Sequence, residues 1–530
     1  MAARGSAGWE GGAPDRARRI AGARASGRPV PEAHDRPLPQ DAEIAIVGAG
    51  FGGLGMAIAL KQRGIEDFVV LERAADVGGT WHANTYPGCQ CDVPSNLYSF
   101  SFAPNPGWTH SYPEQPQIQS YLRACAERFG VLAHTHLRCE LQEAAWDADG
   151  ARWQITTSRG SLSAKVLVAA PGLLSEPQLP LIPGIGGFRG TIFHTSRWDH
   201  AHDLTGERVA LIGTGATAIQ VGPQIRPRAA RLHVFQRTPP WILPHPDRAI
   251  APRLRRLYAR VPPVQRLARK VDYALRECLA AGMVHDPRLL KAPELIARTL
   301  LRVQVRDRAL RERLRPRYAI GCKRVLLSND WYPMLTAANT ELVTDPIAEV
   351  RERSIVTRDG TERAVDSIVL ATGFKPTDPA IAYRLAGAHG RLLADVWNGS
   401  PQAYLGTTIS GFPNLFVLYG PNLNLGHSSI VYMLESQIGY VLQAIELLRR
   451  RGARALEVRA SVQRAFNEAI ARRLATTVWD SGGCASWYLD ANGRNSTMWP
   501  DYTFRYRRLV ERLDPGDYVI EPARQELATA

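Results

Sequence analysis

Two glycine-rich turns, each between an apolar run and a helix-like stretch, constrain the fold of this chain more than any other feature. Residues 48–53 read Gly-Ala-Gly-Phe-Gly-Gly, and residues 213–218 read Gly-Thr-Gly-Ala-Thr-Ala. Such a strand–turn–helix unit binds a dinucleotide, because its glycines let the pyrophosphate approach backbone N–H groups at the helix N-terminus. The sequence therefore predicts an α/β fold with two dinucleotide-binding, Rossmann-like domains. The residues expected at the pyrophosphates are Gly48, Gly50 and Gly53 in the first turn and Gly213, Gly215 and Thr217 in the second.

The charged residue that follows each turn distinguishes the two sites. Glu72 lies 24 residues after Gly48, and Arg237 lies 24 residues after Gly213. A carboxylate can accept hydrogen bonds from ribose hydroxyls and repels a 2′-phosphate, whereas a guanidinium pairs with that phosphate. We therefore expect FAD or NAD in the first site and NADPH in the second. The pair is typical of a flavoprotein that accepts hydride from NADPH.

One alternative is that only one of the turns belongs to a nucleotide site and the other is a chance cluster of glycines. The matched spacing of the charged residues argues against this alternative. Ala218 stands where the pattern has its third glycine. This replacement only slightly loosens the packing of helix on strand.

The cysteines bear on the compartment of the protein. The chain has seven of them and no Cys-x-x-Cys pair. This pattern is typical of a reducing compartment and argues against a disulfide framework and a zinc site. Residues 1–40 contain no apolar segment like that of a secretory signal, so we expect a cytoplasmic protein.

Most of the net charge of +15 lies in one segment. Residues 251–317 contain 18 Lys and Arg against 6 Asp and Glu, and the arginines alternate with leucines at helical spacing. This pattern predicts amphipathic helices with a solvated charged face. We therefore expect neither nucleic acid nor a membrane as a partner. The oligomeric state stays open.

The order of these segments predicts that one nucleotide domain is inserted within the other. The Pro/Gly-rich passage near 171–190 marks a crossing between domains, and the apolar run 367–371 is a buried strand. We assign residues 1–40 to a disordered tail, 41–180 and 366–530 to an FAD-binding domain, 181–245 and 318–365 to an NADP-binding domain, and 246–317 to a helical insertion.

A segment between the two predicted domains matches a known fingerprint. Residues 188–199 read Phe-Arg-Gly-Thr-Ile-Phe-His-Thr-Ser-Arg-Trp-Asp and match F-x-G-x-x-x-H-x-x-x-W-[P/D] at every fixed position. On this motif the chain resembles the type I Baeyer–Villiger monooxygenases of the flavin-containing monooxygenase superfamily. The resemblance covers about residues 43–510. It places the motif near the hinge between the nucleotide domains, so we assign no acid or base role to His194.

Further segments resemble the same family and imply site residues. Residues 78–92 resemble its G-G-x-W-x-x-N-x-Y-P-G-x-x-x-D segment, which follows the flavin and ends in an aspartate facing the active site. Residues 321–324 resemble its Lys-Arg pair, 236–238 its phosphate-binding Q-R-T, and 486–488 its S-W-Y. The implied cofactor-binding residues are Gly79, Thr80, Trp81, Asp92, Arg237, Thr238, Lys323 and Trp487.

The resemblance also implies a reaction. NADPH would reduce FAD, O2 would form a C4a-peroxyflavin, and one oxygen atom would enter next to a ketone carbonyl to give an ester or lactone. Arg324 is the catalytic candidate that stabilises the negative charge formed in this reaction. Asp92 is the second catalytic candidate, because it can hold Arg324 by a charge-assisted hydrogen bond. The partners are a small-molecule ketone and O2.

The nearest alternative is a flavin-containing monooxygenase that oxygenates nitrogen or sulfur. Trp198-Asp199 and Lys323-Arg324 favour the ketone-oxidising reading. A flavin disulfide reductase would need a dithiol pair, and a basic non-enzymatic scaffold remains a further alternative. Residues 420–427 and 489–495 depart from the best-known cyclic-ketone enzymes, so the ketone is not identified.

Overall fold

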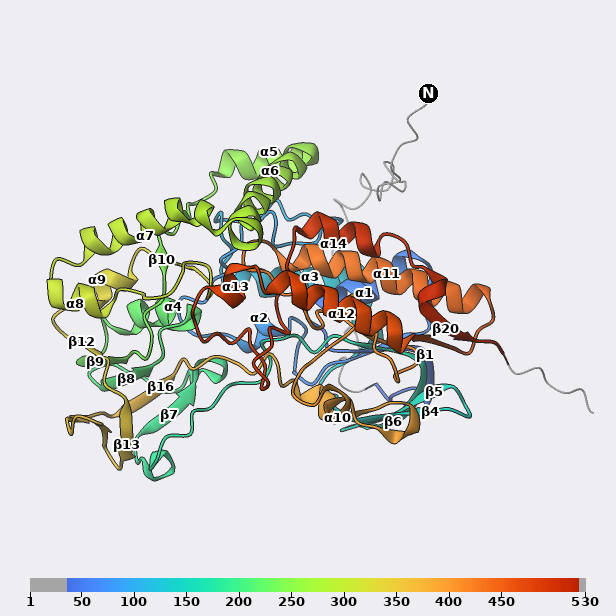
Figure 1. Ribbon diagram of the computed structural model, residues 1–530, viewed down its shortest axis with the longest axis horizontal. Helices are drawn as coiled ribbons and strands as arrows, with labels where there is room; N and C mark the ends of the chain where they lie inside the picture. Colours follow the sequence, from blue (N-terminus) through green and yellow to red (C-terminus); the bar gives the residue numbers. More distant parts are fainter. Residues whose placement is uncertain (1–35, 524–530) are drawn as a thin grey trace, which may run out of the picture.

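The computed structural model describes residues 36–523, and most of the predicted disordered tail therefore lies outside the described residues. Within that tail, residues 36–40 are described, and the carbonyl of Gln40 accepts a hydrogen bond from the backbone of Ser163 at 2.9 Å. Figure 1 shows two lobes side by side, each built on its own sheet, with a group of helices along one edge.

The first lobe is built on an eight-stranded sheet in which β6, β1, β2 and β3 are parallel neighbours. The apolar run of β1 is buried on both faces of the sheet, as parallel strands require. The strands are β1 (Asp41–Val47), β2 (Phe68–Leu71), β3 (Thr135–His136), β4 (Leu141–Asp147), β5 (Arg152–Thr157), β6 (Gly160–Ala169), β17 (Leu385–Ala386) and β18 (Leu415–Val417).

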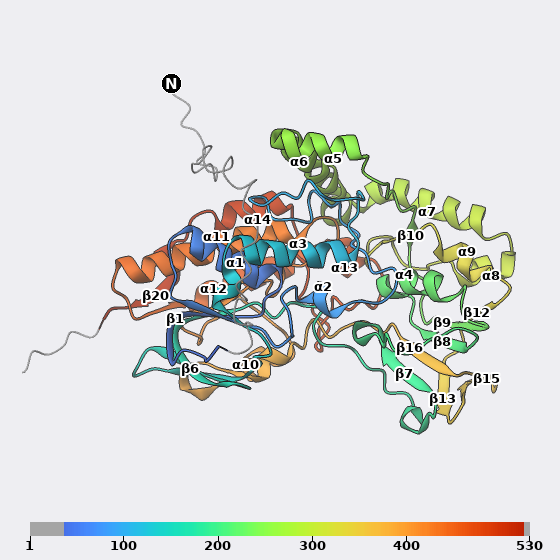
Figure 2. The same cartoon turned by 180° about the vertical axis from the view of Figure 1, so that it is seen from behind.

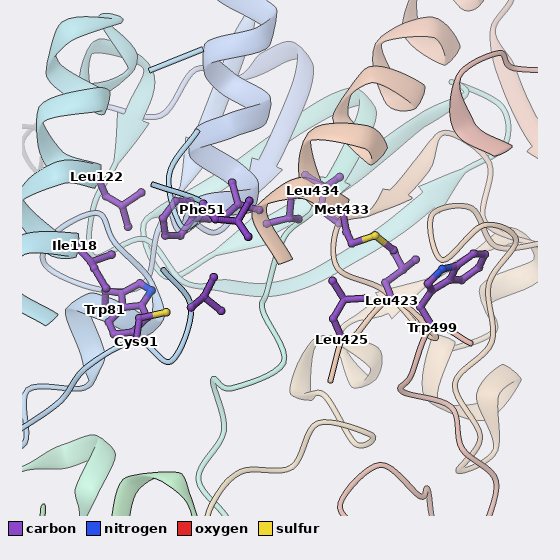
Figure 3. Close-up of a cluster of buried hydrophobic side chains, with 14 of the residues drawn as sticks. Phe51, Trp81, Cys91, Ile118, Leu122, Leu423, Leu425, Met433, Leu434 and Trp499 are labelled. Atoms are coloured by element: carbon purple, nitrogen blue, oxygen red, sulfur yellow. The ribbon is translucent and has the colours of Figure 1, made fainter. Parts of the chain in front are cut away.

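Helices cover this sheet and enclose the core behind the first glycine-rich turn. Figure 3 shows Phe51 of α1 (Phe51–Gln62), Ile118 of α3 (Gln115–Arg128) and Leu434 of α11 (Ile430–Arg450) in one apolar cluster. Because Phe51 directly follows Gly50, the core fixes the helix end that faces the turn. The remaining elements here are α10 (Leu393–Trp397), β19 (Ala455–Val458), α12 (Ala460–Leu474), α13 (Val478–Ser481), α14 (Thr503–Val510) and β20 (Tyr518–Glu521).

The second lobe is built on a parallel five-stranded sheet in the order β12-β9-β8-β16-β7. A three-stranded antiparallel sheet lies beside it. The elements are β7 (Thr191–His194), β8 (Arg208–Ile212), α4 (Ala216–Ile225), β9 (Arg231–Phe235), α9 (Trp331–Leu335), β12 (Thr340–Val343), β13 (Ile347–Arg351), β14 (Ser354–Thr357), β15 (Glu362–Ala364) and β16 (Ser367–Leu370).

Strand β16 corrects one predicted boundary. It pairs with β7 and β8 in the second sheet, whereas the prediction assigned residues from 366 onward to the FAD-binding domain. A short buried apolar strand has the same local pattern in either sheet, so the sequence did not identify its partner strand. The chain crosses back only after Gly373, whose carbonyl accepts a hydrogen bond from the backbone of Gln178 at 2.8 Å. The two crossings between the lobes therefore lie side by side.

The predicted helical insertion is helical in the structure. It contains α5 (Pro252–Arg260), α6 (Pro262–Ala280), α7 (Lys291–Gln304) and α8 (Arg308–Arg313), with short π and 3-10 turns between α6 and α7. Strands β10 (Ile242–Leu243) and β11 (Leu326–Leu327) pair and hold its two ends together. In Figures 1 and 2 these helices run along the edge of the molecule over both lobes. Among residues 36–523, no helix is both long and apolar enough to cross a membrane.

Candidate active site

A cavity of about 1280 Å³ brings the two glycine-rich turns together between the lobes. It exceeds the roughly 300–1,000 Å³ of a typical single-ligand site. All of the predicted site residues line it except Gly53. A Cβ atom at Gly53 would lie 1.8 Å from the carbonyl oxygen of Gly48, so Gly53 permits close packing of α1 against the turn. The geometry therefore gives Gly53 a packing role and not a place on the cavity wall.

The first turn presents an open helix end to the cavity. Gly48 has φ of +98°, and a Cβ atom there would lie 2.5 Å from the carbonyl oxygen of Ala170. Helix α1 begins after Gly50 with no capping side chain and no acidic residue in its first turn. The free N–H groups and the positive end of the helix dipole suit a pyrophosphate.

Glu72 lies at the rim of the first turn with its carboxylate fixed by backbone groups. The side chain is buried, and it accepts hydrogen bonds from the N–H groups of Ala49 at 2.7 Å and Ala74 at 2.8 Å. A carboxylate has about four acceptor positions, so two remain for ribose hydroxyls. This arrangement fits the adenosine ribose of FAD.

The predicted flavin loop contacts the first turn directly. Gly79 has φ of +56°, and a Cβ atom there would lie 2.9 Å from the Cα atom of Gly50. Thr80 begins the short helix α2 (Thr80–Ala83), and Trp81 donates a hydrogen bond from its Nε1 to the hydroxyl of Tyr98 at 3.0 Å. The backbones of Gly79 and Gly50 can approach so closely only because both residues are glycines.

The second turn has the same construction in the other lobe. Gly213 has φ of +117°, and a Cβ atom there would lie 2.3 Å from the carbonyl oxygen of Ala371. Helix α4 begins after Gly215, again without a capping side chain. The hydroxyl of Thr214 donates to the carbonyl oxygen of Thr238 at 3.1 Å and ties the turn to the segment that follows β9. Thr217 lines the cavity from the first turn of α4.

Two cations stand close together on the cavity wall near this turn. The side chain of Arg237 is exposed, and the ammonium of Lys323 lies 5.2 Å from the ring centre of Tyr318. Neither cation forms an ion pair with any residue of 36–523. Burial lowers the pKa of the Lys323 ammonium, and the charge of Arg237 lowers it further. Unneutralised neighbouring cations suit a dianion such as a 2′-phosphate.

Arg324 and Asp92 form a two-point ion pair deeper in the cavity. The guanidinium donates from Nε and Nη2 to the two carboxylate oxygens at 2.5 and 2.6 Å. A third bond, from Nη1 to the carbonyl oxygen of Leu425, is 3.3 Å long. Burial alone would raise the pKa of Asp92, but the charge and hydrogen bonds of Arg324, together with the charge of Arg276, outweigh burial and lower it. The pair therefore stays ionised, and it fixes a positive charge at the cavity wall.

Known proteins resemble this chain over nearly its whole length. Residues 45–262 match the family model described as pyridine nucleotide-disulphide oxidoreductase. A relative from Streptomyces coelicolor named Baeyer-Villiger monooxygenase is 47% identical over 493 residues, which are 93% of this chain and 95% of the relative. One of the same name from Pseudomonas aeruginosa is 47% identical over 488 residues, 91% and 93% of the two chains. The chain belongs to the Baeyer–Villiger monooxygenase family.

Solved structures agree with this membership. A steroid monooxygenase bound to NADP superposes with a TM-score of 0.81 at 30% identity, covering 91% of this chain and 100% of the other. The OTEMO complex with FAD and NADP superposes with a TM-score of 0.81 at 25% identity, covering 90% and 99%. The predicted family, fold class and enzyme class are thus confirmed.

Arg276, which the sequence analysis did not identify, lies near the Asp92–Arg324 ion pair. It extends from α6, and its Nη2 lies 2.8 Å from the hydroxyl of Tyr112 and 3.4 Å from the backbone carbonyl oxygen of Asp92. Its charge also helps to lower the pKa of Asp92. No motif marks it among the many arginines of the insertion, and only its position on the helix face could have suggested an inward direction.

A disulfide between two distant segments corrects the prediction from cysteine spacing. Cys322 and Cys484 are bonded across 162 residues, with their Cα atoms 6.2 Å apart. The absence of a Cys-x-x-Cys pair excludes only a dithiol between neighbouring cysteines. The spacing of cysteines along the chain does not show which distant cysteines come together in the fold, so it could not reveal this bond. The cysteine argument for a reducing compartment therefore no longer holds. The bond ties the segment of Lys323 and Arg324 to the loop that contains Trp487.

Trp487 completes the cavity wall on this side, and the buried Tyr488 packs behind it. Trp487 is 40% exposed, lines the cavity and packs edge to face on Tyr488 with ring centres 4.6 Å apart. Burial raises the pKa of Tyr488 to about 12. Tyr419 also lines the cavity, and its hydroxyl donates to the Oδ1 atom of Asn424 at 2.7 Å. Asn424 belongs to a segment in which the chain departs from the best-known cyclic-ketone enzymes.

The fingerprint segment, residues 188–199, lies outside the cavity. His194 ends β7, is buried, and accepts a hydrogen bond at Nδ1 from the backbone of Ser196 at 3.1 Å. Burial lowers the pKa of this histidine. Phe193 and Trp198 pack edge to face with ring centres 4.9 Å apart. These contacts are those of a structural connection between the lobes, and they give His194 no acid or base role.

Proposed function

We propose that this chain is an FAD- and NADPH-dependent monooxygenase that inserts one oxygen atom of O2 next to a ketone carbonyl and releases an ester or lactone. The observation that carries the proposal is the Asp92–Arg324 pair, which lies on the wall of the cavity that joins both dinucleotide turns. The solved neighbours support it, since one holds NADP and another holds FAD and NADP.

The residues present suit both cofactors. The first site would hold FAD through Gly48, Gly50, Glu72, Gly79, Thr80 and Trp81. The second would hold NADPH through Gly213, Gly215, Thr217, Thr238, Arg237, Lys323 and Trp487. When bound, these cofactors supply hydride transfer and oxygen activation, and the protein supplies placement and charge.

Arg324 provides the charge that the reaction requires. Negative charge develops on oxygen as the carbonyl of a ketone is attacked, and a guanidinium already held in place stabilises it without reorganisation. Asp92 is the positioning partner, because its two hydrogen bonds fix the guanidinium plane. Removing one preorganised donor of this kind typically raises a barrier by about 3–4 kcal/mol.

The experiment compares wild type with Arg324→Ala in an assay that follows NADPH consumption and ester formation on a ketone panel. We expect the variant to bind FAD and to oxidise NADPH while ester formation falls about 10²–10³-fold. Ester formation at the wild-type rate would refute the role of Arg324. Wild-type oxidation of a thioether without oxidation of any ketone would favour the heteroatom-oxygenating alternative.

A further inference from the structure

Helix α6 exposes its apolar side chains to solvent and turns its polar side chains toward the protein. Leu267, Val271, Leu275 and Leu279 follow one another at intervals of four residues and expose between 40% and 64% of their surface. Side chains at this spacing lie on one face of a helix. The apolar face of α6 therefore points to solvent, whereas a helix on a protein surface ordinarily buries such a face.

The opposite face of α6 is polar and makes specific contacts with the protein. Gln265 donates to the carbonyl oxygen of Asn105 at 2.7 Å, and Arg269 donates to the carbonyl oxygens of Asn96 and Ser99 at 2.7 and 2.8 Å. Glu277 and Arg276 continue this inward face. These bonds fix the rotation of α6 about its own axis. The apolar face of the helix is therefore held in its outward direction.

The neighbouring helix α5 extends the exposed apolar surface. Leu254 and Leu257 of α5, and Val261 between the helices, are 37–42% exposed. Both helices lie at the edge of the molecule in Figures 1 and 2. We call these seven side chains of α5 and α6 the apolar ridge. Contiguous exposed apolar surface on a folded protein marks an interaction site.

Cations surround the apolar ridge, and no exposed carboxylate of α5 or α6 balances them. The two carboxylates of these helices, Asp272 and Glu277, lie on the inward face. Some surface arginines elsewhere are paired, as Arg449 is with Glu43. The exposed cations of the two helices, none of which forms an ion pair with a described residue, are Arg253, Arg256, Arg260, Arg266 and Lys270.

We propose that the apolar ridge binds peripherally to an anionic phospholipid bilayer. The leucines and valines would enter the boundary between headgroups and acyl chains, and the flanking cations would contact lipid phosphates. The contact is interfacial and needs no spanning helix. It revises the expectation from composition that a membrane is not a partner, because composition does not reveal which face of α6 points outward.

Charge argues against a second copy of this chain as the occupant. A symmetric pairing through the ridge would bring identical sets of unpaired cations together, which is unfavourable. A bilayer with anionic headgroups complements the same cations. Arg276 contacts the backbone of Asp92 from the inner side of α6, so the apolar ridge lies on the opposite side of this helix from the ion pair. An apolar ketone dissolved in lipid would then be concentrated beside the cavity.

The test is co-sedimentation of the full-length holoenzyme with vesicles of phosphatidylcholine alone and of phosphatidylcholine mixed with phosphatidylglycerol. We expect the wild type to sediment with the anionic vesicles only and to be released by salt. The triple variant Leu267→Ser, Val271→Ser, Leu275→Ser removes exposed apolar groups and should lose binding. The charge variant Arg266→Glu, Lys270→Glu should lower the partition coefficient at least about tenfold.

Matched controls alter the same residue types away from the ridge. Val519→Ser in β20 and Arg464→Glu with Arg472→Glu in α12 should bind vesicles as the wild type does, and every variant should keep its NADPH oxidation rate. Equal binding of wild type and both ridge variants would overturn the proposal, as would no binding of the wild type to anionic vesicles. Dimerisation in analytical ultracentrifugation that the triple variant abolishes would assign the ridge to a second copy instead.

Discussion

Replacing Asp92 with asparagine tests how the protein holds its key cation. The two carboxylate oxygens accept hydrogen bonds from Arg324 at 2.5 and 2.6 Å. An amide of the same shape keeps one acceptor oxygen and turns an N–H group toward the guanidinium. The variant therefore leaves Arg324 in the cavity with one bond fewer and no neutralising charge. Because Arg276 also points at this position, two cations would then share the wall without an anion.

The expected losses of stability and of catalytic rate in Asp92→Asn follow from the burial of the ion pair and from the typical effect of removing a preorganised donor. Breaking a fully buried ion pair costs about 3–5 kcal/mol. The two side chains keep 28% and 25% of their exposure, so solvent screening reduces the stability loss to about 1–2 kcal/mol. The catalytic loss is larger, about 3 kcal/mol or 10²-fold in ester formation, because the donor loses its fixed geometry.

The assay follows ester formation and NADPH oxidation for wild type, Asp92→Asn, Arg324→Ala and the double variant. Residues that act as one unit give non-additive effects, so the double variant should be no slower than Arg324→Ala alone. Independent, additive losses would refute the idea that Asp92 acts by holding Arg324. Unchanged ester formation in Asp92→Asn would refute it as well.

The same variant has a signature in acid. The pKa of Asp92 in the folded protein is lower than the ~3.9 of an unfolded aspartate, so its ionisation stabilises the fold above about pH 4. That contribution is lost as pH falls through the folded pKa. Acid unfolding monitored by fluorescence should thus show a steeper loss of stability in wild type than in Asp92→Asn.

Two further changes test the nucleotide site and the covalent link. Arg237→Gln should raise KM for NADPH about 10–100-fold and leave KM for NADH unchanged, because the lost bonds are charge-assisted contacts with the 2′-phosphate; Arg228→Gln, an exposed change outside the cavity, is the control. Equal effects on both nucleotides would contradict this role. Cys484→Ser should lower thermal stability by about 2–4 kcal/mol, seen as a lower Tm. A reductant should lower the wild-type Tm and leave that of the variant unchanged, and insensitivity of the wild type would count against the disulfide.

The parts of the fold that sequence predicted are those with local signals. Each glycine-rich turn has its strand, its glycines and its helix within about twenty residues, so β1 with α1 and β8 with α4 could be located. The helical insertion was also predictable, because the helical spacing of its leucines and arginines is a local feature of the sequence. The Asp92–Arg324 pair came from family resemblance, since 232 residues separate its members.

The features that sequence missed depend on pairing across long distances. The partners of β16, the bond between Cys322 and Cys484, and the inward direction of Arg276 are all set by tertiary packing. The outward face of α6 belongs to the same group. A helical pattern shows that a helix is amphipathic, but only the packed molecule shows which face its neighbours cover.

The paired crossings between the lobes have a mechanical consequence. Residues near 176–178 and 373–375 run side by side, and Lys375 donates from its backbone to the carbonyl oxygen of Glu176 at 3.0 Å. Two connections joined by hydrogen bonds resist twisting more than a single connection does. A relative motion of the lobes would therefore be a hinge rotation about an axis perpendicular to the two connections. Such a rotation would open and close the gap between the glycine turns while each turn keeps its own shape.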